Sequence, residues 1–164
     1  FIPVFNRFYK EIASGNEPVG LTYRSHLAEG DLLPQLAATR SRDILIGYTT
    51  RGIHRDDMEM TLDDYPMKRI GSQGQCKTYL VALKLAQYEF LAQHGLTTPI
   101  LLLDDLFDKL DTSRVERIMQ LVASDVFGQI FITDTNREYL DQIVRQTTAH
   151  HSLFKVVNGV FTSL

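Results

Sequence analysis

Apolar residues recur every three or four positions in five stretches of the chain, which is the spacing of one face of an α-helix. These stretches are residues 3–14, 29–43, 76–94, 112–124 and 137–146. Asp31 is suited to cap the start of the second stretch, and Gly95 is suited to end the third. Ser113 and Glu116 have the spacing of a capping box and predict where the fourth helix begins. The third stretch is apolar on two sides and is therefore predicted to be buried on both.

Other apolar residues follow the patterns of β-strands. Residues 58–62 alternate apolar and polar side chains, and together with residues 67–70 they are predicted to form a hairpin. Two short unbroken apolar runs, 99–105 and 128–135, are typical of parallel strands covered on both faces. An Asn-Gly pair at 158–159 predicts the tight turn of a second hairpin. Strands that alternate with helices in this way predict an α/β sheet domain.

Composition narrows the class of protein. The 164 residues are long enough for one domain with a core, and 44% hydrophobic and 23% charged residues are ordinary values for a globular protein. No stretch approaches the ~20 apolar residues that span a bilayer, so we expect no membrane role. A single cysteine excludes an internal disulfide and favours the cytoplasm. Because the chain begins with Phe1, we expect it to be a piece of a longer protein.

Two adjacent acids, Asp104 and Asp105, end the apolar run at 99–105. Ligands bind at the carboxyl ends of strands in open α/β sheets. Hard oxygen ligands suit Mg²⁺, so Asp104 is a candidate metal ligand, and Asp105 is a candidate to orient or deprotonate water. Neighbouring strand residues point to opposite sides, so the two acids can have different roles. The structural alternative is that aspartate caps a helix or a turn.

The segment GSQGQCKT at 71–78 nearly matches the phosphate-binding loop G-x-x-x-x-G-K-[ST]. Cys76 stands where the second glycine belongs, and its Cβ would obstruct the wrapping of the backbone around phosphate. A helix start whose N–H groups meet an anion held by another surface is one interpretation, and a plain capping sequence is another. The residues that offer these groups are Ser72, Gln73, Gly74 and Gln75. A kinase with a degenerate loop is a third interpretation, and it would depend on Lys77.

Several segments together resemble ABC-type ATPases in the variant form of the RecF family of bacterial recombination and repair proteins. The segments are GSQGQ (71–75, the signature motif), ILLLDD (100–105, the Walker B strand), FDKLD (107–111, the D-loop) and IFITDT (130–135, the strand that follows). The segment YTTRGIHRDDMEM at 48–60 resembles the stretch before the signature, with Ile53 where the family usually has proline. The likeness covers nearly the whole chain.

This resemblance implies a fold class of α/β, as the C-terminal half of an ABC-type P-loop ATPase head with part of a helical arm. Residues 1–47 would form the end of the arm domain and residues 48–164 the C-terminal lobe of the head. The Walker A loop of the family is missing from the chain, so the chain alone is expected to be inactive. In the complete protein the implied cofactors are ATP and Mg²⁺, with ATP sandwiched between the heads of a homodimer.

The resemblance also implies roles for single residues. Ser72 and the N–H groups near Gly74 would contact the terminal phosphate of a nucleotide carried by the partner head. Asp104 would hold Mg²⁺ through water. Asp105 stands where most ABC proteins carry glutamate, and its shorter reach implies slow turnover.

Two further positions follow from the same motifs. The D-loop likeness adds Asp108 and Asp111 to the expected nucleotide-binding residues. Many ABC proteins place a switch histidine near the position of Thr133, and this sequence has none there.

The family implies binding of DNA at single-strand/duplex junctions and help in loading recombinase at gaps. Recombination mediator proteins are the implied partners, in DNA repair, replication, recombination and the SOS response. The net charge of −3 argues against a uniformly basic surface, so DNA contacts would come from a local patch, first at Arg40, Arg42 and Arg51. Solvated surface charge is the alternative for these arginines. A different class of function is a non-catalytic interaction module that works through the helices of residues 1–42.

Overall fold

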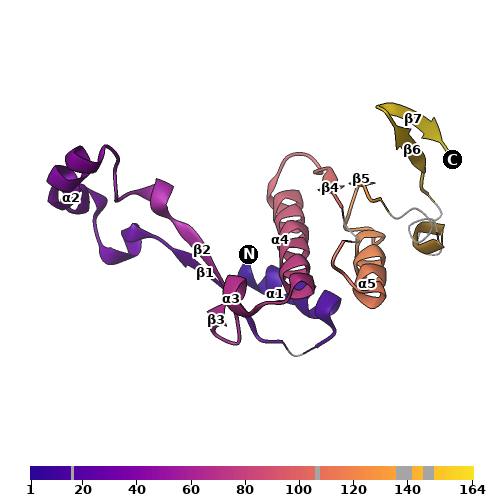
Figure 1. Ribbon diagram of the computed structural model, residues 1–164, viewed down its shortest axis with the longest axis horizontal. Coiled ribbons are helices and arrows are strands. Elements are labelled where there is room, and N and C mark those ends of the chain that lie inside the picture. The colour runs from indigo at the N-terminus through magenta and orange to yellow at the C-terminus, as the bar shows by residue number, and fades with distance from the viewer. Residues whose placement is uncertain (16, 106–107, 136–141, 146–149) are drawn as a thin grey trace. The chain divides into compact units, whose positions relative to one another are not determined.

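The structure is a computed structural model that describes residues 1–15, 17–105, 108–135, 142–145 and 150–164 (Figure 1). The chain forms two compact units. Unit 1 comprises Phe1–Asn16 and Ser72–Leu164, and unit 2 comprises Glu17–Gly71. The boundary predicted after residue 47 would separate an arm domain from an ATPase head, and this domain assignment stays a prediction. Most of the helix predicted at 137–146 lies outside the described residues.

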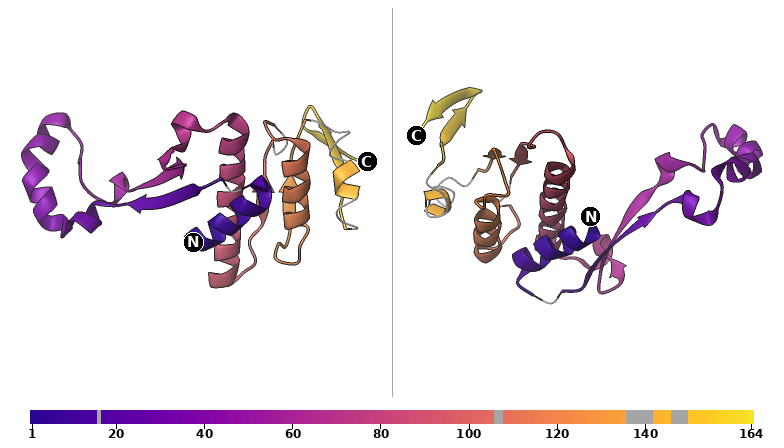
Figure 2. Two further views of the ribbon diagram at one scale, coloured as in Figure 1. Left: turned by 90° about the horizontal axis from the view of Figure 1, so that it is seen from below. Right: turned by 180° about the vertical axis from the view of Figure 1, so that it is seen from behind.

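Three helices provide most of the core of unit 1. They are α1 (Ile2–Ala13), α4 (Gln73–His94) and α5 (Thr112–Val122). Helix α1 packs against both α4 and α5 (Figures 1 and 2). The rings of Phe5 on α1 and Tyr79 on α4 lie 4.6 Å apart between centroids, and both side chains are buried. Because aromatic rings bury large apolar areas, this contact anchors the first turns of α4 on α1.

Helix α4 is buried on one side. Val81, Leu85 and Tyr88 are buried, whereas 52% of Leu80 and 48% of Leu91 are exposed. The prediction of burial on two sides is therefore wrong for the part of the chain that the structure describes. Periodicity shows which sides of a helix are apolar, but it carries no information about what is present to cover them.

A pair of parallel strands lies beside these helices in unit 1. Strand β4 (Leu101–Leu103) pairs with β5 (Ile130–Ile132), and α5 connects them along the chain. The two predicted strands are thus present, in the strand–helix–strand order that was expected. Leu101 and Leu103 are buried, but 63% of Leu102 is exposed. Within the described residues the strand is covered on one face only, which corrects the prediction of two covered faces.

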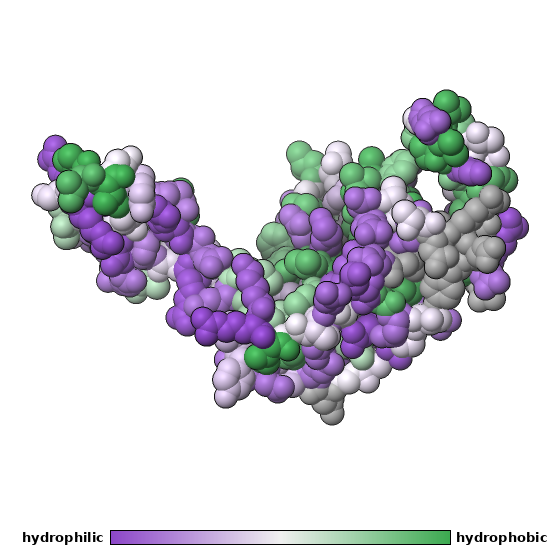
Figure 3. All heavy atoms as spheres, in the orientation of Figure 1, coloured by the Kyte–Doolittle hydropathy of each residue, from purple (hydrophilic) through white to green (hydrophobic). Residues whose placement is uncertain are grey.

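The chain ends in the predicted hairpin of β6 (Phe154–Val157) and β7 (Val160–Ser163). Asn158 and Gly159 have φ values of 49° and 78°, the left-handed backbone that a two-residue turn requires. The side chains of both strands are exposed, and Figure 3 shows apolar groups at the surface of this hairpin.

Unit 2 contains an antiparallel sheet of β1 (Val19–Arg24), β2 (Asp57–Leu62) and β3 (Tyr65–Pro66). Strand β1 was not predicted, because its pairing partner β2 lies far from it in the sequence. The return strand predicted at 67–70 is wrong, since Met67–Ile70 form the short helix α3. Pro66 has no N–H group with which to extend the ladder, so the chain leaves the sheet there.

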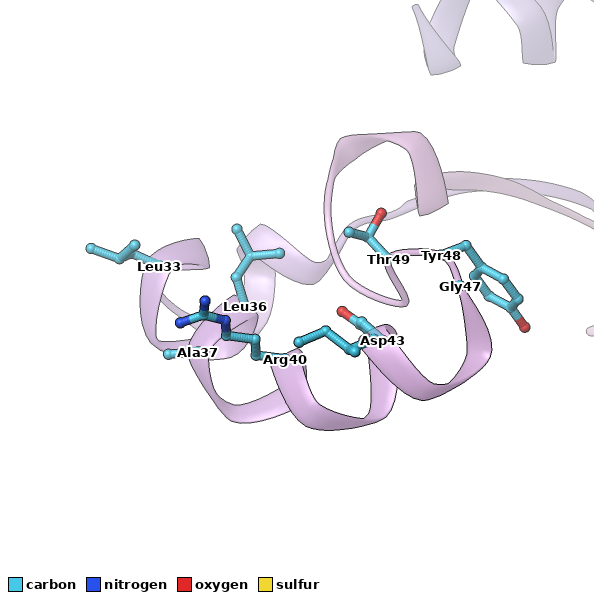
Figure 4. A pocket seen from close by; sticks show the side chains of 9 residues that line it. Leu33, Leu36, Ala37, Arg40, Asp43, Gly47, Tyr48 and Thr49 are labelled. Carbon is cyan, nitrogen blue, oxygen red and sulfur yellow. The ribbon is translucent and has the colours of Figure 1, made fainter.

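The rest of unit 2 is formed by α2 (Leu32–Ile46), the 3₁₀ turns η1 (His26–Glu29) and η2 (Ile53–Arg55), and the loop after α2. Asp31 is the N-cap of α2 as predicted, although its side chain makes no capping hydrogen bond. Asp43 accepts hydrogen bonds from the hydroxyl and the N–H of Thr50, at 2.7 and 3.1 Å. These bonds hold the pKa of Asp43 below its usual value, and the bond from the Thr50 hydroxyl has the largest effect. They also fix the loop beside an open hollow along α2 (Figure 4).

Candidate functional site

The turn that begins α4 is a complete capping box. Ser72 is the N-cap, and its hydroxyl accepts a hydrogen bond from the N–H of Gln75 at 3.2 Å. The side chain of Gln75 accepts one from the N–H of Ser72 at 2.8 Å. The N–H groups of Gln73 and Gly74, in the first turn, have no acceptor within the helix. Ser72 and Gln73 are exposed, so this helix start is open to an anion from outside.

Gly74 permits a close approach between this turn and the segment before α5. A Cβ at position 74 would lie 3.0 Å from the carbonyl oxygen of Lys109 and 3.1 Å from a guanidinium nitrogen of Arg114. Any larger residue would therefore require these neighbours to shift by a few tenths of an ångström. The signature-like turn and the D-loop-like segment are thus neighbours within unit 1, although about 35 residues separate them in sequence.

The two candidate acids directly follow β4 and are exposed. Thr133, which directly follows β5, donates a hydrogen bond from its hydroxyl to Oδ1 of Asp104. The same hydroxyl accepts a hydrogen bond from the N–H of Asp105 at 3.3 Å. One threonine therefore holds both acids at the carboxyl edge of the parallel strands, where ligands bind in sheets of this kind.

Asp105 is held from a second direction by helix α4. The ammonium of Lys77 donates a hydrogen bond to the backbone carbonyl of Asp105 at 2.7 Å. Asp105 has a φ of 50°, in the left-handed region. Its carboxylate has no hydrogen-bond partner among the described residues, so the group remains available for chemistry. The contact gives Lys77 a partner within its own chain, in place of the phosphate that a degenerate loop would require.

The two D-loop aspartates differ in their surroundings. Asp111 is the N-cap of α5, and Oδ1 accepts hydrogen bonds from the Ser113 hydroxyl at 2.7 Å and the Arg114 N–H at 3.0 Å. These bonds, led by that of Ser113, lower the pKa of Asp111. The predicted capping box that started at Ser113 is therefore wrong. Asp108 is exposed and lies 3.3 Å from the ammonium of Lys109.

The donor set at the strand edge fits Mg²⁺ bound largely through water. Asp104 offers a carboxylate and Thr133 a hydroxyl oxygen, both hard oxygen ligands. Among the residues that the structure describes, no group of three or more His, Cys, Asp or Glu side chains gathers into a metal site. A cation that keeps several of its own waters suits such a sparse set, whereas a cation that needs a full protein cage does not.

The arginines considered for DNA contact lie in unit 2. Arg40 and Arg42 are exposed on α2, and the charge of Arg42 interacts with the carboxylate of Asp43. Figure 4 shows Arg40 beside the hollow along α2. Arg51 forms an ion pair with Glu29 at 2.6 Å, so part of its charge is compensated within unit 2.

The sequence predicted Asp104 and Asp105 at the end of a strand and Ser72 and Gln75 at the start of a helix, but not how these two segments are linked. The linking groups are Lys77 and Thr133, which lie 28 and 29 residues from their partners. A lysine in the second turn of a helix was a signal that could have been noticed. Cations near a helix N-terminus are electrostatically unfavourable and call for a compensating partner.

Known proteins match the chain along nearly its whole length. The DNA replication and repair protein RecF of Bacteroides fragilis is 56% identical over 164 residues, and that of Parabacteroides distasonis is 57% identical over 159. RecF of Porphyromonas gingivalis is 51% identical over 160 residues. The chain spans 44% of the length of each of these relatives, so it matches less than half of any of them. No family model matches the chain.

Solved structures confirm the fold class. Two structures of the recombination mediator protein RecF in the RecFOR pathway, one with ATP and one with ATPrS, superpose with TM-scores of 0.70 and 0.69 at 24% identity. Each covers 99% of this chain, and the chain covers 43% of each. The resemblance to the RecF family and the predicted α/β fold class are confirmed. In the described part of the chain, no helix has the length and apolar character needed to cross a membrane.

Proposed function

From a chain that resembles RecF along its whole length, we propose that these residues form the C-terminal part of a RecF-type ATPase in DNA repair and recombination. In the complete protein two heads sandwich ATP, and each head presents the turn at Ser72 to a nucleotide carried by the other. The proposal is supported above all by one observation: the open turn at Ser72 and the acids at Asp104 and Asp105 lie in the same unit, and Lys77, on the helix that this turn begins, bonds to the backbone carbonyl of Asp105.

The turn contributes hydrogen-bond donors. The N–H groups of Gln73 and Gly74 and the hydroxyl of Ser72 donate to the terminal phosphate of the nucleotide that the partner head carries. Gln75 completes the capping box and holds Ser72 in place. Because these donors are preorganised by the helix, they need little reorganisation to stabilise a phosphate charge. The exposed position of Ser72 and Gln73 is what such a contact between two molecules requires.

The two acids have separate roles, Asp104 toward the metal ion and Asp105 toward the attacking water. Asp104, supported by Thr133, would hold Mg²⁺, and the bound metal would neutralise phosphate charge. Asp105 accepts a hydrogen bond from the attacking water and orients it. Its side chain is one methylene shorter than glutamate, so its reach is shorter and turnover is slow. Of the D-loop acids, Asp108 is exposed and free to approach the nucleotide, whereas Asp111 acts mainly through the start of α5.

DNA and partner proteins are bound by the complete protein. DNA contacts are made to phosphates by Arg40 and Arg42, with Arg51 as a lesser contributor because of its pair with Glu29. Binding is at single-strand/duplex junctions, and the protein cooperates with recombination mediators to load recombinase at gaps. By this assignment residues 1–47 end the arm and residues 48–164 belong to the head.

Hydrolysis of ATP tests the proposal. The chain by itself is expected to bind and hydrolyse ATP weakly or not at all, because it carries no loop that grips the α- and β-phosphates. In a full-length RecF-type polypeptide that carries these residues, Asp104→Asn and Ser72→Arg each abolish DNA-stimulated hydrolysis. Asp125→Asn and Ser152→Arg, at exposed positions outside the site, are the matched controls and leave the rate unchanged. Tight Mg²⁺-dependent ATP binding by the isolated chain, or full activity of Asp104→Asn, would contradict the proposal.

The second candidate function is a non-catalytic interaction module. It is favoured by the apolar side chains exposed on α2, where Leu33, Ile44 and Leu45 are each more than 70% exposed. Figure 3 shows apolar groups gathered at this end of unit 2. For such a module the same variants at Asp104 and Ser72 leave function intact. Replacement of the three α2 residues by serine removes it instead.

A further inference from the structure

Both peptide groups that flank Asp105 are tied to other elements of unit 1. Its N–H donates to the hydroxyl of Thr133 at 3.3 Å, and its carbonyl accepts from the ammonium of Lys77 at 2.7 Å. The carboxylate between these two ties is exposed and has no partner among the described residues. The backbone of this residue is therefore held while its side chain stays available.

The backbone conformation of Asp105 needs such support. A φ of 50° places the residue in the left-handed region, which residues with a side chain adopt uncommonly. A conformation of this kind persists when surrounding contacts over-determine it. The bond from Lys77 is charge-assisted, and at 2.7 Å it is shorter than most bonds between neutral groups, so it is the stronger of the two ties.

The position of Lys77 is unfavourable for its own helix. Helix α4 begins at Gln73, so the ammonium lies on the second turn, close to the positive end of the helix dipole. No acidic residue occupies the first turn of α4 to offset this charge. A residue that breaks a local rule is commonly retained for a contact made elsewhere, and here that contact is the carbonyl of Asp105.

We propose that Lys77 is a positioning residue for catalysis: its bond to the Asp105 carbonyl fixes where the Asp105 carboxylate stands. The inference rests on the proposed function, in which that carboxylate orients the attacking water. Helix α4 would then have two roles. The turn at its start contacts the nucleotide of the partner head, and its Lys77 positions Asp105 of the same head. Ser72 and Lys77 are separated by little more than one helical turn.

Steady-state hydrolysis by a full-length RecF-type polypeptide that carries these residues tests the inference. Lys77→Met keeps most of the side chain's length and removes the donor, and it is expected to lower kcat by roughly 10- to 100-fold, as small misplacements of catalytic groups do. KM for ATP is expected to change less than about twofold, because the lost contact acts in the transition state and leaves ground-state binding intact. Lys77→Arg, which still donates to the carbonyl, restores most of kcat. Lys84→Met, at an exposed lysine of the same helix, is the control and leaves both parameters unchanged.

A double variant separates positioning from a general loss of structure. In Asp105→Asn the acid is already disabled, so adding Lys77→Met is expected to cost little further activity. Independent losses that multiply in the double variant would overturn the inference, and so would a Lys77→Met enzyme with normal kcat. If Lys77→Met does not fold, the comparison moves to Lys77→Leu, which also lacks a donor, and Lys77→Arg, and equal activity of these two would overturn the inference. If Asp105→Asn itself hydrolyses ATP normally, the proposed function fails, whereas a silent Lys77 with an essential Asp105 refutes the positioning role alone.

Discussion

The hydroxyl of Thr133 donates a hydrogen bond to Oδ1 of Asp104, and this bond ties together the residues that directly follow β5 and β4. The two residues are 29 positions apart and meet because the strands are parallel and in register, with Leu103 opposite Ile132. The threonine therefore orients the acid that is proposed to hold magnesium. The same hydroxyl accepts a hydrogen bond from the N–H of Asp105, so it contacts both acids at the strand edge.

Removal of this hydroxyl is expected to weaken the response to magnesium. In a full-length RecF-type polypeptide with these residues, Thr133→Val keeps the branched shape and deletes the donor. A hydrogen bond to a charged group contributes about 1.5–3 kcal/mol, so the Mg²⁺ concentration for half-maximal ATP hydrolysis should rise by roughly ten- to a hundredfold. Titration of hydrolysis with Mg²⁺ measures this shift. Thr162→Val, at an exposed position of β7, is the control, and an unchanged midpoint in Thr133→Val would refute the orienting role.

The cap at Asp111 predicts a dependence of stability on acid. Its folded pKa lies below the ordinary value of 3.8, so the contribution of the carboxylate is present above pH 3.8 and is lost as the pH falls through the folded pKa. The difference in unfolding free energy between the wild type and Asp111→Asn should be constant near neutrality and shrink below pH 3.8. Urea unfolding of the isolated chain from pH 3 to 7 measures it. Asp125→Asn, outside any cap, should show no comparable change.

At neutral pH the same cap predicts a loss of stability. Asp111→Ala leaves the Arg114 N–H at the start of α5 without its acceptor, and loss of an N-cap costs about 1 kcal/mol. Because α5 packs on α1, the midpoint of urea unfolding should fall for the whole of unit 1. Asp111→Ser, which can also cap, should recover most of the loss. Equal stability of the alanine and serine variants would show that the cap has no energetic role.

The buried phenol of Tyr79 predicts that the stability of the chain decreases at alkaline pH. Burial raises its pKa from 10.0 to about 12, and only 1% of the residue is exposed. Its contribution to stability is complete below pH 10 and is lost as the pH rises through about 12, because the unfolded chain releases the phenol proton first. Tyr79→Phe should therefore lose less stability than the wild type between pH 9 and pH 11.5, as followed by urea unfolding. Tyr65→Phe, at an exposed tyrosine, should behave like the wild type, and an equal loss in Tyr79→Phe would contradict the assignment.

The proposed DNA contacts predict a change in salt dependence. Reversal of charge at both Arg40 and Arg42 should weaken binding of a single-strand/duplex junction by the complete protein and lower the salt slope by about 2. Fluorescence anisotropy at several salt concentrations measures both effects. Lys155→Glu, an exposed cation on β6, is the control. Arg51→Glu should act mainly on stability, because it breaks the pair with Glu29, and normal junction binding by the double variant would show that the patch is wrong.

Local patterns in the sequence were sufficient for α1, α2, α4 and α5 and for the Asn-Gly hairpin. Helical spacing, cap residues and turn residues act over a few positions, so these features can be recognised from the sequence alone. Where local signals competed, the sequence misled. Residues 67–70 follow a turn and were predicted to return as a strand, yet they form α3 after Pro66. Ser113 has capping-box spacing, yet Asp111 caps α5.

Tertiary structure alone decided which motif residues meet. Strand register set the contact between Thr133 and Asp104, and the packing of α4 beside the strand edge set the contact between Lys77 and Asp105. Periodicity shows which side of a helix or strand is apolar. It does not show which element covers that side, or in which register a strand pairs with its neighbour. Contacts across 28 or 29 residues depend on how the whole chain closes, and for that reason only the folded arrangement revealed them.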